Sequence, residues 1–382
     1  AGVPQTLAVD RAGRLSDLRY DLTFTIPAAR TARVTGRATL RFALTDASRP
    51  LALDFEPGGT PDVRVTAING AAAAVPWTSG HLQLPARALL AGVNTVSLEF
   101  TAGDVPLNRN DDFLYTIFVP ARAHEAFPAF DQPDLKTRWT LTLDLPDGWQ
   151  ALANGAETSR RSANGRTRVQ FAETPPISTY LFAFAAGQFR IESGTRNGRT
   201  FRIFHRETDD QKVARNRASL FDLHAASLAW LEQYTGIPYP FGKFDVLLVP
   251  AFQFGGMEHP GAVFYNASAQ MLDESATQNQ LLERASTIAH ETAHMWFGDL
   301  VTMRWFTDVW MKEVFANFMA AKIVNPSFPD INHDLRFLHA YYPAAYEVDR
   351  TPGTNAIRQP LDNLKDAGTL YGAIIYQKAP IV

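Results

Sequence analysis

Asn-Gly dipeptides, which favour tight hairpins between antiparallel strands, occur in the first half of this chain and are absent after residue 198. Both residues of such a pair tolerate positive φ, as a type I′ hairpin turn requires. The pairs are Asn69-Gly70, Asn154-Gly155, Asn164-Gly165 and Asn197-Gly198. They predict that the first part of the chain folds into β-hairpins and that a different architecture follows.

The hydrophobic pattern changes in the same region. Residues 18–26 alternate apolar with polar side chains, and residues 139–145 do so again, which is typical of half-buried strands. After the strand-like segment 178–189, helical spacing replaces the alternation, for example in residues 214–234. We therefore expect an N-terminal antiparallel β-sheet domain over residues 1–188 and a mixed α/β domain over residues 189–382.

Composition excludes several kinds of site. The 36 basic and 39 acidic side chains give a net charge of −3, which argues against a nucleic-acid partner. Because cysteine is absent, any metal must be held by His, Asp and Glu. The longest apolar run, residues 180–187, is far shorter than the roughly 18–20 residues of a membrane span. The compartment is open; we favour a periplasmic or secreted protein over a cytoplasmic one.

A histidine pair lies on the most clearly marked helix of the second domain. Thr277 and Gln280 fit a capping box at its start, and Gly298 is a suitable stop. The helix contains an HExxH motif at residues 290–294, so His290 and His294 project from one face, one turn apart. Two imidazoles in this arrangement can bind one metal ion.

A third ligand follows on a second expected helix, from about Lys312 to Val324. Glu313 comes after an 18-residue spacer, and three protein ligands with an open fourth position are typical of catalytic zinc. Apolar residues surround the motif, so its polar side chains are expected to point inward and to need partners. The alternative is a surface helix that carries His and Glu by chance. We predict one zinc ion on His290, His294 and Glu313, with Glu291 as the general base.

The segment 290–318, HETAHMWFGDLVTMRWFTDVWMKEVFANF, closely resembles the zinc-binding segment of the aminopeptidase N family. FGGMEHPGAVFY at 254–265 is similar to that family's GxMEN exopeptidase motif, and the resemblance extends to residues 127–141, 178–189 and 234–250. It implies a multidomain α+β fold, in which an N-terminal β-saddle domain precedes a thermolysin-like catalytic domain. It also implies a zinc-dependent aminopeptidase acting on peptides with a free N-terminus.

The resemblance assigns further roles to individual residues. Glu258 matches the residue that binds the substrate's α-ammonium group, and Gly255 and Gly256 would let the substrate backbone lie alongside. Tyr376 occupies the place of the tyrosine that stabilises the oxyanion, with Tyr371 as a competing candidate. The chain departs from the family where His259 replaces an Asn and Val314 replaces a Gly. The candidates for holding an imidazole's second N–H group are Asp299, Asp308 and Asn317.

Three alternatives to the aminopeptidase are open: a zinc endopeptidase, an epoxide-type hydrolase of the same fold, and a catalytically idle peptide-binding relative. Retention of Glu291 and Glu258 argues against the idle protein, because a structural zinc site needs neither. Members of the family continue well past the tyrosine motif, whereas this sequence stops at Val382. We therefore expect the catalytic domain to be truncated here, with the remaining C-terminal portion present as a separate chain or lost.

Overall fold

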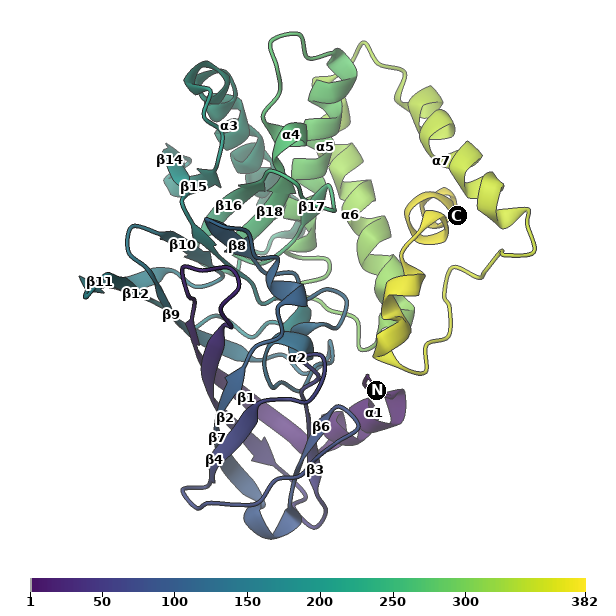
Figure 1. Ribbon diagram of the computed structural model, residues 1–382. Coiled ribbons are helices and arrows are strands. Elements are labelled where there is room, and N and C mark those ends of the chain that lie inside the picture. The colour runs from purple at the N-terminus through teal and green to yellow at the C-terminus, as the bar shows by residue number, and fades with distance from the viewer. Residues whose placement is uncertain (1) are drawn as a thin grey trace. The chain divides into compact units, whose positions relative to one another are not determined.

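The structure is a computed structural model that describes residues 2–382 (Figure 1). It divides into two compact units. The N-terminal unit contains the residues up to Phe189 together with Asp362–Lys365, and the C-terminal unit contains Arg190–Leu361 and Asp366–Val382. Within residues 2–382, no helix combines the length and the apolar character that crossing a membrane requires.

The N-terminal unit is built mainly from β-sheets. The largest has the strand order β11 (Glu157–Ala163), β12 (Arg166–Phe171), β9 (Arg138–Pro146), β1 (Leu15–Thr25), β2 (Thr35–Leu44), β7 (Gly92–Thr101) and β4 (Val63–Ile68). Two smaller sheets have the orders β10 (Gln150–Ala153), β13 (Phe184–Gly187), β8 (Phe113–Tyr115) and β3 (Leu51–Asp54), β6 (His81–Leu84), β5 (Trp77–Thr78). The helical segments are α1 (Gln5–Arg14), α2 (Ala123–Ala126) and the short turns η1 (Ala86–Ala88), η2 (Val105–Leu107) and η3 (Thr179–Leu181).

The Asn-Gly pairs behave in two ways. Asn164-Gly165 and Asn197-Gly198 have positive φ at both residues and join β11 to β12 and β14 (Arg190–Arg196) to β15 (Arg199–His205), as predicted. Asn154-Gly155 is different, because β10 and β11 belong to different sheets. The buried Asn154 side chain instead bonds the backbone of residues 181 and 183. The prediction of a hairpin at Asn154-Gly155 was wrong, because the Asn154 side chain forms hydrogen bonds with a segment that is distant in the sequence.

The expected strands at 18–26 and 139–145 are confirmed as β1 and β9. Their pairing is parallel, with Tyr20 opposite Trp139, while β1–β2, β2–β7 and β9–β12 are antiparallel. The sheet is therefore mixed at this pair rather than wholly antiparallel. Aromatic rings from this sheet and from segments outside it form the core: Trp139 of β9 stacks on Phe182 with ring centres 4.4 Å apart, and Phe118 meets Phe127 edge to face at 5.4 Å.

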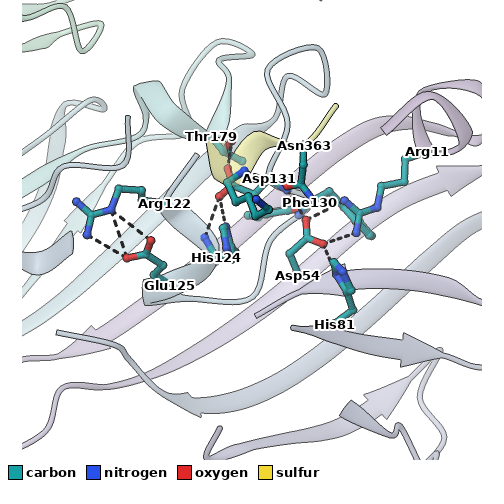
Figure 2. A network of polar contacts seen from close by, with 12 residues as sticks. Arg11, Asp54, His81, Arg122, His124, Glu125, Phe130, Asp131, Thr179 and Asn363 are labelled. Carbon is teal, nitrogen blue, oxygen red and sulfur yellow. Dashed lines mark hydrogen bonds and ion pairs between the residues drawn. The ribbon is translucent and has the colours of Figure 1, made fainter. Parts of the chain in front are cut away.

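The N-terminal unit also buries a polar network, shown in Figure 2. Asp54 accepts hydrogen bonds from the Arg11 guanidinium at 2.8 Å, from His81 Nδ1 at 2.7 Å and from the Asp131 N–H at 2.9 Å. The Asp131 carboxylate contacts His124 Nδ1 at 2.7 Å and accepts from Thr179 Oγ1 at 2.6 Å. Each buried carboxylate thus has several donors, which offsets the cost of removing its charge from water.

The C-terminal unit combines a mixed sheet with longer helices. The sheet order is β14, β15, β16 (Phe244–Val249), β18 (Ala262–Asn266) and β17 (Gly256–Met257). The helices are α3 (Asp210–Thr235), α4 (Ala267–Gln270), α5 (Gln278–His294), α6 (Val309–Val324) and α7 (His333–Asp349). Shorter helical turns are η4 (Phe306–Asp308), η5 (Asn325–Ser327), η7 (Ile374–Lys378) and η8 (Ala379–Ile381), and η6 (Leu364–Leu370) has residues in both units. The β-rich unit followed by an α+β unit confirms the expected fold class.

Helices α5 and α6 lie side by side and carry the HExxH motif and Glu313 (Figure 1). The predicted capping box is present: Thr277 accepts from the Gln280 N–H, and the Gln280 side chain accepts from the Thr277 N–H. Helix α5 ends at His294, before Gly298, and α6 begins at Val309, slightly earlier than expected. A small apolar core joins the two helices: Leu282, Ala285, Ala289, Ala320 and Val324.

Candidate metal and catalytic site

The two histidines of the HExxH motif face each other at the C-terminal end of α5. Their Nε2 atoms lie 3.0 Å apart, and the rings are nearly perpendicular at 88°. His294 is buried, while the side chain of His290 is 16% exposed. The spacing of four residues therefore places both imidazoles around one point, as predicted.

Glu313 reaches the same point from α6. Its Oε2 atom lies 3.3 Å from His290 Nε2 and 3.5 Å from His294 Nε2. The three ligand atoms lie within 4.8 Å of one another, so these residues could hold one metal ion. Two imidazole nitrogens and one carboxylate oxygen form a donor set that suits zinc.

The other ring nitrogen of each histidine has an oxygen partner. His290 Nδ1 lies 2.9 Å from Asn317 Oδ1, and His294 Nδ1 lies 3.0 Å from the Phe297 carbonyl. A carbonyl oxygen can only accept, so Nδ1 carries the proton in the neutral ring and Nε2 offers its lone pair. Of the three predicted candidates, Asn317 is the one that orients an imidazole side chain.

The other two candidates have different surroundings. Asp308 accepts from Arg358 Nε at 2.6 Å, which makes it part of a surface ion pair. Asp299 is buried, and its backbone N–H donates to the His294 carbonyl at 3.0 Å. Asp299 therefore supports the end of the motif helix through its backbone.

Glu291 is buried beside the histidines. Within residues 2–382 its carboxylate has no hydrogen bond and no ion pair. Burial raises its pKa to about 8; His290 opposes this, while the carboxylates of Glu258 and Glu313 act in the same direction as burial. A cation held by the ligand atoms would lower this pKa by Coulombic attraction. An otherwise unpaired carboxylate at this place can take up and release a proton.

Gly256 lies in β17 against the Glu291 side chain. A Cβ atom added to Gly256 would overlap the Glu291 carboxylate, so glycine is needed there for close approach. Gly255 is less restricted, since the nearest atom to its Cβ position is Thr287 Cγ2 at 3.9 Å. Their expected role beside the substrate backbone stays a prediction, but Gly256 also has a packing role that the sequence did not indicate.

Glu258 follows β17 and is buried with Lys312 of α6. The two side chains form a short ion pair, and Lys312 Nζ also lies 3.2 Å from Glu313 Oε1. Burial alone raises the pKa of Glu258, but the Lys312 ammonium and His294 outweigh it and hold that pKa at about 2. Sequence reasoning missed Lys312, although a lysine immediately before Glu313 in an otherwise apolar stretch was a usable signal.

Tyr376 lies on the π-helical turn η7, and its ring centre is 6.3 Å from that of Tyr371. Burial raises the pKa of both phenols, and Glu313 raises both further. The buried Tyr371 hydroxyl has no hydrogen-bond partner in the described part of the chain. Both tyrosines are thus close enough to the ligand group to feel its charge, and the choice between them stays open.

His259, where the chain departs from the family motif, is fully buried. Its ring meets Phe264 at 4.6 Å, and neither ring nitrogen has a hydrogen-bond partner within residues 2–382. Burial lowers its pKa to about 3, so the ring is neutral near pH 7. His259 therefore adds no charge next to Glu258.

The chain is similar in sequence to known peptidases. Residues 105–181 match the Peptidase M1 N-terminal domain, and residues 220–382 match the Peptidase family M1 domain. The chain is 35% identical over 277 residues to a puromycin-sensitive aminopeptidase of Caenorhabditis elegans, covering 71% of this chain and 29% of that protein. It is 32% identical over 263 residues to a leucyl aminopeptidase of Saccharolobus solfataricus, covering 69% and 33%. The chain thus spans about a third of the length of the curated relatives it matches.

Proposed function

Since the chain belongs to the aminopeptidase N family of M1 peptidases, we propose that it carries the zinc-binding and catalytic residues of an aminopeptidase. The reaction is hydrolysis of the peptide bond that follows the N-terminal residue. The convergence of His290 Nε2, His294 Nε2 and Glu313 Oε2, with the unpaired Glu291 beside them, is the observation that carries this proposal.

His290, His294 and Glu313 would hold the zinc ion. Two neutral imidazoles and one carboxylate leave a net positive charge when they bind a dication, and they fit the donor chemistry of a catalytic site. When bound, zinc supplies Lewis-acid polarisation and lowers the pKa of a water molecule towards about 7. Asn317 and the Phe297 carbonyl contact the Nδ1 atoms, which would leave both Nε2 atoms available to hold an ion.

Glu291 acts as the general base and then as the general acid. Its carboxylate accepts a proton from the attacking water while the water oxygen bonds to the scissile carbonyl carbon. It then donates that proton to the leaving nitrogen as the C–N bond breaks. Burial beside Gly256 keeps this carboxylate poorly solvated, which raises its basicity.

Two further residues complete the proposed site. Glu258 binds the α-ammonium group of the substrate, which places the cut after the first residue by a charge-assisted hydrogen bond. The phenol of Tyr376 donates to the carbonyl oxygen as negative charge develops there, and Tyr371 is the alternative donor. A phenol with its ordinary pKa of about 10 is protonated at neutral pH, and burial raises the pKa of both tyrosines further.

A pair of chromogenic substrates tests the proposal: leucine p-nitroanilide and its N-acetylated twin. The protein should cleave the free amine, should lose activity with a chelator and should regain it with added zinc. Comparable turnover of the acetylated compound would favour the endopeptidase alternative. Activity that survives complete zinc removal would contradict a zinc hydrolase.

A further inference from the structure

Lys312 connects two functional carboxylates without being one of the predicted site residues. It lies on α6 next to Glu313, and only 6% of its side chain is exposed. Its Nζ atom pairs with Glu258 Oε1 and also lies 3.2 Å from Glu313 Oε1. A buried lysine needs such partners, because an isolated ammonium is costly to remove from water.

The two oxygens of Glu313 face different partners. Oε2 lies 3.3 Å and 3.5 Å from the two imidazoles, whereas Oε1 faces Lys312 at 3.2 Å. The Lys312 contact therefore leaves free the oxygen that turns towards the histidines. Lys312 can keep its place on Glu258 and Glu313 when a metal ion is bound.

The charge balance of the group bears on substrate binding. Glu258, Glu291 and Glu313 contribute three carboxylates, all buried. One ammonium and one zinc dication balance these carboxylates, so an incoming substrate ammonium adds an excess positive charge. Like charges close together in a buried site repel each other. The substrate amine and Lys312 therefore compete for the same carboxylate.

We propose that Lys312 is a specificity-determining residue that competes with the substrate's α-ammonium group for Glu258. Because the Lys312 ammonium occupies Glu258 Oε1, the substrate amine meets a carboxylate whose charge is already partly neutralised. Lys312 thereby limits how strongly the enzyme distinguishes a free N-terminus from a blocked one. This inference rests on the proposed function, because it takes Glu258 as the amine-binding residue.

Two hydroxamic acids isolate the contribution of the amine: leucine hydroxamate and 4-methylpentanohydroxamate, which lacks only the amino group. Their dissociation constants with the zinc-loaded protein are measured by calorimetry, and the amine ratio is the value without the amine divided by the value with it. Lys312→Gln should raise this ratio about tenfold, since charge-assisted hydrogen bonds contribute roughly 10- to 150-fold in affinity. A folded, zinc-loaded Lys312→Gln protein with an unchanged ratio overturns the inference.

Three further variants complete the experiment. Lys322→Gln removes an exposed lysine from the same helix and should leave the ratio at the wild-type value. Glu258→Gln should bring the ratio close to one; if it leaves the ratio unchanged, Glu258 does not bind the amine and the proposed amine site fails as well. If Lys312→Gln does not fold, Lys312→Arg keeps the charge and can pair with Glu258 through two parallel hydrogen bonds. It should lower the ratio about threefold, and an unchanged ratio there also contradicts the proposal.

Discussion

The two units each bury a cluster of charged side chains, but the clusters differ in how fully they are satisfied. In the N-terminal unit, the Asp54 carboxylate accepts hydrogen bonds from Arg11 and His81, and the Asp131 carboxylate accepts them from His124 and Thr179 (Figure 2). In the C-terminal unit, two Nε2 atoms face each other and the Glu291 carboxylate has no partner in the described chain. In the first cluster both carboxylates have several donors, and the unpaired group is the Nε–H of Arg11, whereas the second cluster has ligand and acceptor atoms without partners in the described part of the chain.

This difference separates a structural network from a candidate site. A buried network in which every group is satisfied contributes rigidity and a defined fold. A cluster with unpaired ligand atoms costs folding free energy unless another species completes it, so its persistence points to function. Substitutions in the N-terminal cluster should therefore affect stability, and substitutions in the C-terminal cluster should affect chemistry.

The largest effect is expected for Glu291→Gln. Loss of the base should lower kcat/KM on leucine p-nitroanilide by about 10²- to 10⁴-fold, while the zinc content stays at one ion per chain. The matched control is Glu283→Gln, an exposed residue on the same helix, which should keep wild-type activity. Zinc loss in Glu291→Gln, measured by atomic absorption, would show that Glu291 is a ligand rather than a base.

The next effect concerns stability in the N-terminal unit. Asp54→Asn leaves the Arg11 guanidinium buried without its countercharge, and breaking a buried pair costs about 3–5 kcal/mol. Urea unfolding should show this loss, and the exposed Asp111→Asn should not. At temperatures where the variant remains folded, its preference for free over acetylated anilide should equal that of the wild type. A changed preference would mean that the Asp54 network contributes to substrate selection and not to stability alone.

Asn317→Ala should have a smaller effect, on zinc binding. Without the Asn317 oxygen the His290 ring loses the partner of its Nδ1–H group, and such losses reduce metal affinity about 10- to 100-fold. Competition with a zinc-binding dye measures the change, with the exposed Asn355→Ala as control. Equal zinc affinity in Asn317→Ala and wild type would exclude Asn317 as a positioning residue.

The smallest expected effect is a pH dependence of stability that arises from His124 and Asp131 in the N-terminal unit. Burial lowers the pKa of His124, but the hydrogen bond and charge of Asp131 outweigh it and raise that pKa above the ordinary value of 6.5. The ion pair is therefore at full strength below about pH 6.5 and weakens as the pH rises through the folded-state pKa. In His124→Gln, the part of the unfolding free energy that the wild type loses as the pH rises above 6.5 should no longer depend on pH. The exposed His339→Gln should retain the pH dependence, and identical pH profiles for both variants would contradict the assignment.

Features that depend on neighbouring residues could be predicted from the sequence. The capping box at Thr277, the i, i+4 placement of His290 and His294, and the hairpin at Asn164-Gly165 all follow from geometry within a few residues. Features that depend on packing could not. The hairpin expected at Asn154 is absent because its side chain bonds a distant segment, and β1 pairs in parallel with β9 rather than antiparallel.

The same division holds at the site. By itself, the sequence determined a helix with two imidazoles on one face and a nearby acidic residue, because helical periodicity dictates the spacing of side chains. Only the tertiary structure decided that Asn317 holds His290, that Gly256 lies against Glu291, and that Lys312 pairs with Glu258. These contacts join separate elements, and the way helices and strands pack determines which atoms meet.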